Sequence, residues 1–89
     1  MVIEQRLAVR AVTQIAVEAA REASPELTVT GVVPVSGGTS YVEILIRAEG
    51  WDADTRQITL GVFRDAGPAA LKKEIYDHLQ RHIHEHRAI

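Results

Sequence analysis

The fold is decided by the stretch Tyr41-Val42-Glu43-Ile44-Leu45-Ile46-Arg47-Ala48. Every second residue of this stretch is apolar, so that an extended strand here has one wholly apolar face and one mixed face. The apolar face comprises Val42, Ile44, Ile46 and Ala48, and the mixed face comprises Tyr41, Glu43, Leu45 and Arg47. A period of two over this length predicts a half-buried β-strand.

Two further stretches are predicted to be strands. Residues 27–35 are rich in β-branched side chains, and Pro34 near their end is typical of an edge strand because proline cannot donate to a ladder. Residues 57–64 alternate again, with Ile58, Leu60 and Val62 on the apolar face. Short loops separate the three stretches, so we expect an antiparallel meander with residues 41–48 in the centre.

Helices are predicted at both ends of the chain. Residues 2–23 carry apolar side chains at helical spacing, and Ser24-Pro25 ends this helix because the residue before a proline avoids the helical conformation. The apolar face comprises Ala8, Val12, Ile15, Ala16, Ala19 and Ala23. Pro68 suits the first position of the second helix, whose stripe comprises Leu71, Ile75, Leu79 and Ile83. The chain is thus predicted to be one α+β domain over residues 1–89, in the order α-β-β-β-α, with both helices packed on the apolar face of the sheet.

The composition is that of a small globular domain. Of 89 residues, 46% are hydrophobic and 25% are charged, with a formal net charge of -2, whereas disordered chains have fewer apolar residues and larger net charges. There is no cysteine, so neither disulfides nor thiolate zinc sites can supplement the core. No apolar run approaches the roughly 20 residues of a membrane span, and the first residues lack the pattern of an export signal. We expect a cytoplasmic protein that does not interact with membranes.

The second face of the sheet is predicted to be an interaction surface. Bulky apolar groups on a face that no helix covers indicate a partner, although single exposed apolar residues are common on any protein. A domain this small also gains stability from oligomerising. We expect self-association, with another protein as the alternative partner, through Val32, Tyr41, Glu43, Leu45, Arg47 and Phe63. Tyr41, Leu45 and Phe63 would be the buried anchors, while Glu43 and Arg47 would set the register.

Histidines occur in the last helix where its apolar stripe should continue. His78, His82 and His86 are spaced four residues apart, so neighbouring members could hold Zn, Ni or Cu through two imidazoles. A complete site needs one or two further ligands from another element or subunit. Two alternatives stay open: amphipathic residues at a helix end, where protonated imidazole complements the helix dipole, and pH-sensitive association. No resident cofactor is expected.

A nucleic-acid-binding module is the second functional hypothesis. The order α-β-β-β-α resembles that of double-stranded-RNA-binding domains, which place lysines near the start of the final helix, where this chain has Lys72 and Lys73. Arg6 and Arg10 on the first helix would extend such a surface. The net charge is negative and Glu74 follows the lysines directly, so we expect no tight binding to nucleic acid.

The loops give little support for catalysis. The glycine-rich turn at residues 36–40 leads into a strand and contains no lysine, so a hairpin loop fits it better than a phosphate-binding loop. Trp51, the only tryptophan, is predicted to fold back as a lid on the core, with an exposed anchor for a partner as the alternative. Without cysteine, the candidate nucleophiles are Ser36, Thr39, Ser40 and Lys72, none of which has a nearby base in the sequence, and all four histidines lie in one helix. We therefore expect a non-enzymatic domain.

Overall fold

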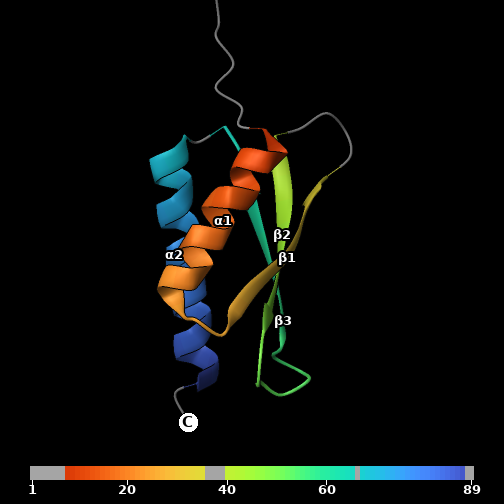
Figure 1. The fold of residues 1–89 in the computed structure, drawn as a ribbon, viewed down its shortest axis with the longest axis vertical. Helices are drawn as coiled ribbons and strands as arrows, with labels where there is room; N and C mark the ends of the chain where they lie inside the picture. The colour runs from red at the N-terminus through yellow and green to blue at the C-terminus, as the bar shows by residue number, and fades with distance from the viewer. Residues whose placement is uncertain (1–7, 36–39, 66, 88–89) are drawn as a thin grey trace, which may run out of the picture.

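The computed structural model describes residues 8–35, 40–65 and 67–87, and it confirms the predicted order of elements. Helix α1 comes first along the chain, three strands follow, and helix α2 comes last (Figure 1). Their bounds are α1 Val9–Ala23, β1 Leu27–Pro34, β2 Tyr41–Ala48, β3 Gln57–Phe63 and α2 Pro68–Arg87. Most of the predicted turn at residues 36–40 lies outside the described residues.

Within the described residues, the first helix begins later than the predicted start at residue 2. Residues 1–7 lie outside the described residues, and Ala8 has an extended backbone with φ −63° and ψ 152°. The helix therefore begins at Val9. Its end agrees with the prediction, because Ser24 is extended and its N–H donates to the Ala20 carbonyl over 2.9 Å.

The molecule has two layers, a sheet and a pair of helices on one side of it (Figure 1). The strands form an antiparallel meander in the order β1-β2-β3, so β2 is central as predicted. Helix α1 contacts β1, α2 contacts β3, and the two helices contact each other. The opposite side of the sheet is not covered by any helix of the described chain, and we call it the open face.

The core lies between the helices and the apolar face of the sheet. Ile44 and Ile46 of β2 are completely buried there, as are Leu71, Ile75 and Leu79 of α2. Burying side chains of this size is worth about 1.5–3 kcal/mol each, so this layer supplies most of the hydrophobic stabilisation. Small residues line the buried side of α1, namely Val12, Ala16, Ala19 and Ala20. They allow the helix to lie close to its neighbours.

A β-bulge in β1 changes which residues face the core. The pairing with β2 shifts between Val29 and Gly31, and the hydroxyl of the intervening Thr30 donates to the Leu45 carbonyl over 3.1 Å. An extra residue in one strand reverses the faces of everything that follows it. Val32 consequently pairs with the buried Ile44 and packs against the core. The predicted placement of Val32 on the open face is wrong, and Val33 lies there instead.

No helix in the described part of the chain is long and apolar enough to cross a membrane.

Candidate functional site

The open face gathers the exposed large apolar side chains of the described chain. Phe63 is 53% exposed, Val33 46% and Val35 36%. Val33 pairs with Glu43, and the Val35 N–H donates to the Tyr41 carbonyl over 3.2 Å, so Val35 continues the ladder beside Tyr41. Val33, Val35, Tyr41 and Phe63 therefore form one apolar end of the open face. Simple alternation along the sequence does not place Val33 and Val35 on this face, although Gly31 inside the strand signals a bulge.

Tyr41 and Phe63 form an aromatic pair across β2 and β3. They lie directly opposite each other, with ring centroids 5.1 Å apart and an interplanar angle of 65°, which is an edge-to-face contact. The Tyr41 ring also crosses over Gly61, because a Cβ built on Gly61 would overlap the Tyr41 ring and its hydroxyl. The absence of a side chain at Gly61 thus lets the phenol lie flat along the sheet, which holds this aromatic surface in place.

Leu45 lies at the middle of the open face, between two charged residues of the same strand. Its cross-strand neighbours are Gly31 and Thr59, both small, so the leucine side chain stands above them. Glu43 is half-buried, and Arg47 is exposed with its Nε 3.3 Å from Glu49 Oε1. The structure therefore brings five of the six predicted interface residues onto one face, the exception being Val32.

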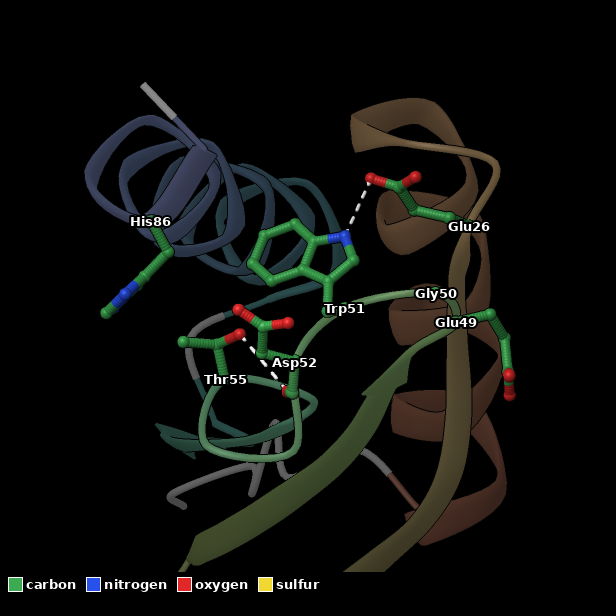
Figure 2. Close-up of a pocket in the computed structure, with 7 residues that line it drawn as sticks. All are labelled: Glu26, Glu49, Gly50, Trp51, Asp52, Thr55 and His86. Atoms are coloured by element: carbon green, nitrogen blue, oxygen red, sulfur yellow. Dashed lines mark hydrogen bonds between the residues drawn. The ribbon is translucent and has the colours of Figure 1, made fainter. Parts of the chain in front are cut away.

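The loop between β2 and β3 folds back over the end of the core (Figure 2). Trp51 packs against the core, its Nε1–H donates to Glu26 Oε1 over 3.0 Å, and its indole stacks on His82 at 5.9 Å between centroids and 12° between planes. The prediction that Trp51 acts as a lid is confirmed. The loop is anchored by two main-chain bonds, Ala48 N–H to Arg56 O and Glu49 N–H to Glu26 O.

A shallow depression adjoins the indole (Figure 2). Its lining comprises Glu26, Glu49, Gly50, Trp51, Asp52, Thr55 and His86. The Thr55 hydroxyl donates to the Asp52 carbonyl over 3.3 Å, while the Glu49 side chain points away from the indole. The hydroxyl bond belongs to the turn itself, and among the described residues that line the depression no nucleophile is hydrogen-bonded to a base.

Two of the three candidate metal ligands lie together. The rings of His82 and His86 are 4.4 Å apart between centroids, and His82 Nε2 is buried without a hydrogen-bond partner. His78 lies elsewhere on α2, beside a depression that Lys73 and Asp77 also line. Within the described residues, no group of three or more His, Asp or Glu side chains is placed to hold a metal ion. A metal site therefore stays a prediction, and the geometry supports only a two-imidazole clamp.

The pKa of His82 is lowered in the folded chain. Burial of the ring is the main cause, because it penalises the charged form, and the neighbouring His86 adds to the effect by repulsion. The Thr55 main-chain carbonyl and the Glu85 carboxylate oppose the shift. His82 is therefore a neutral aromatic platform for Trp51 at neutral pH.

The two lysines among the candidate nucleic-acid residues are paired with neighbouring acids. Lys72 Nζ lies 2.7 Å from Glu22 and 3.7 Å from Glu18, both on α1, and the hydrogen bond with Glu22 raises the pKa of Lys72. Lys73 Nζ lies 2.7 Å from Asp77 on the same helix. Arg10 is exposed on α1, and Arg6 lies outside the described residues. A phosphate would have to displace these carboxylates, so the arrangement does not favour a polyanion.

Comparison with known proteins found no matching family model, no similar curated protein and no similar solved structure.

Proposed function

We propose that this chain is a non-enzymatic interaction domain of the cytoplasm that associates with a second copy of itself through the open face. The observation that carries the proposal is the Tyr41–Phe63 aromatic pair, whose Phe63 ring is exposed on the side of the sheet without helices. Contiguous apolar surface in such a position is typical of protein–protein contacts. Tyr41, Leu45 and Phe63 are the anchors that a partner would bury.

The energetic gain from these anchors is substantial for so small a face. Roughly 100 Å² of the Phe63 side chain remains in contact with water, and its burial would contribute about 2.5 kcal/mol. Leu45 would add a smaller amount from the centre of the face. Association also costs several kcal/mol in lost freedom of motion, so we expect a micromolar rather than a nanomolar complex.

Glu43 and Arg47 determine the orientation of the complex. They stand two residues to either side of Leu45 and carry opposite charges. When two open faces stack with β2 antiparallel to its counterpart and Leu45 at the centre, each Glu43 lies opposite the partner's Arg47. Parallel stacking would instead oppose like charges, which disfavours it.

Charge reversal tests this proposal. We expect Glu43→Arg alone and Arg47→Glu alone to weaken self-association about tenfold each, measured by sedimentation equilibrium, because each opposes like charges twice. The double variant should recover most of the loss. Gln14→Arg, an exposed position on α1, is the matched control and should behave as wild type. Single reversals without effect would refute the open face as the contact.

A further inference from the structure

The two outer strands of the sheet differ at their free edges. The β1 edge carries Pro34 and the bulge at Thr30, and prolines and bulges are devices that block pairing with another strand. Strand β3 has no charged residue and no proline, and its register with β2 is regular throughout. A row of unpaired main-chain groups without such protection is a template for an additional strand. Among the described strands, only β3 presents one.

The hydrogen-bond phase of β3 shows which groups point outward. Ala48 N–H donates to Arg56 O over 2.8 Å, and Arg64 N–H donates to Ser40 O over 2.9 Å. Main-chain groups alternate along an antiparallel ladder, so even-numbered residues of β3 turn toward β2. The main-chain N–H and C=O groups of Gln57, Thr59, Gly61 and Phe63 point away from β2, toward the free edge. In the described chain, no main-chain bond from outside the sheet satisfies them.

We propose that β3 pairs antiparallel with β3 of a second copy, across a two-fold axis perpendicular to the sheet. A strand of Gln57–Phe63 overlaps itself completely only when the axis passes through Leu60. This register places Thr59 opposite the partner's Gly61 and Gln57 opposite the partner's Phe63. All four outward-turned residues then occupy hydrogen-bonded positions, as the phase of the ladder requires.

The burial of the core-facing residues in β3 agrees with this pairing. Leu60 keeps 8% exposure, compared with 3% for Ile58 and 0% for Val62, so the residue on the proposed axis is the least completely covered. A second copy would cover it with its own Leu60. The unfavourable part of the contact lies at the two ends, where Arg56 approaches the partner's Arg64, and added salt should therefore strengthen the pairing.

The open face of one copy is small, and pairing two copies through β3 would enlarge it. Three strands about 4.8 Å apart, with a rise of about 3.4 Å per residue, present roughly 350 Å². Two such faces stacked together bury roughly 700 Å², less than the ~1,200 Å² of a stable interface. Pairing through β3 joins two faces into one six-stranded sheet, and two such sheets reach the required area. The edge pairing itself does not require the open faces to associate.

Amide hydrogen exchange of the wild-type chain, followed by NMR, tests the proposal directly. We expect the amides of Gln57, Thr59, Gly61 and Phe63 to become protected as protein concentration rises. The outward-turned amides of Val29 and Val32 on the blocked β1 edge are the internal control and should not change. The same protection in Leu45→Glu would show that the edge acts without the open face. Fast exchange at all four β3 amides at the highest concentration would overturn the edge pairing, even where the chain associates by its open face.

Cysteine cross-linking tests the register. The chain has no cysteine, so each introduced thiol is unique. Residues facing each other at a non-hydrogen-bonded antiparallel position have Cα atoms about 4.5 Å apart, within disulfide range. Leu60→Cys should form a disulfide-linked dimer on mild oxidation, whereas Ile58→Cys and Val62→Cys should do so only when mixed. Dimers from either of the latter alone, or none from Leu60→Cys, would overturn the proposed axis.

Discussion

Replacement of Trp51 by alanine is expected to destabilise the domain strongly. The indole covers the end of the core, stacks on His82 and donates to Glu26, so the variant loses all three contacts at once. Glu26 and His82 belong to different elements from the Trp51 loop, which means that the lid ties three parts of the chain together.

The size of the effect follows from these contacts. Burial of roughly 100–150 Å² of indole contributes about 2.5–3.5 kcal/mol, and a part-buried hydrogen bond contributes about 1 kcal/mol. Relaxation of the loop recovers part of this, so we expect Trp51→Ala to lower the free energy of unfolding by about 2–4 kcal/mol. Trp51→Phe keeps the stacking but loses the hydrogen bond, and should cost about 1–1.5 kcal/mol.

Urea denaturation followed by far-ultraviolet circular dichroism measures these differences, since the variants lack the tryptophan for fluorescence. Asp54→Ala, at an exposed position of the same loop, is the control and should lie within about 0.5 kcal/mol of wild type. A free energy of unfolding for Trp51→Ala within that same range would show that the indole does not act as a lid.

Three further predictions concern the charged and titratable groups. The fold lowers the pKa of His82 below its usual value near 6.5, so the folded chain binds fewer protons there than the unfolded chain. The free energy of unfolding should therefore decrease as the pH falls from 6.5 through the pKa of His82 in the folded chain. His82→Phe should flatten this pH dependence, and a variant with the same pH dependence as wild type would contradict the prediction. Excess Zn²⁺ should raise the melting temperature only slightly, an effect lost in His82→Ala and kept in His78→Ala, whereas a large shift saturating at one metal per chain would show a complete site. Duplex RNA or DNA should bind no tighter than about 10⁻⁵ M at physiological salt, and submicromolar binding abolished by Lys72→Glu with Lys73→Glu would reverse this conclusion.

The architecture was predictable because the alternation of apolar and polar residues in the strands indicates a sheet with one buried face. Residues 41–48 alternate without interruption, and the structure buries the four residues that the pattern assigns to the core. In β1 the same counting fails after Thr30, because a bulge inserts one residue there. Gly31 signals an irregularity in the strand, but pairing with β2 decides where the extra residue lies. Simple alternation therefore puts Val32 on the open face, where the structure has Val33.

The contacts of the candidate sites were only partly predictable. Helical spacing indicates that His82 and His86 are neighbours, and their rings are in contact. The bond from Trp51 to Glu26 joins residues 25 positions apart, and the ion pairs of Lys72 cross from α2 to α1. Such contacts depend on how the elements pack, so the sequence could indicate that Trp51 is a lid but not which partners hold it.

The most direct test of the open face as a self-association surface is the solution mass of the wild-type chain beside Leu45→Glu, measured by light scattering from about ten to several hundred micromolar. Leu45 lies at the centre of the face, and a glutamate there would bury an unpaired charge in the complex. The account predicts that the mass of the wild type rises above that of one chain with increasing concentration, and that Leu45→Glu rises less at every concentration. A wild type that keeps the mass of one chain throughout, or a Leu45→Glu variant that matches the wild type, would contradict it.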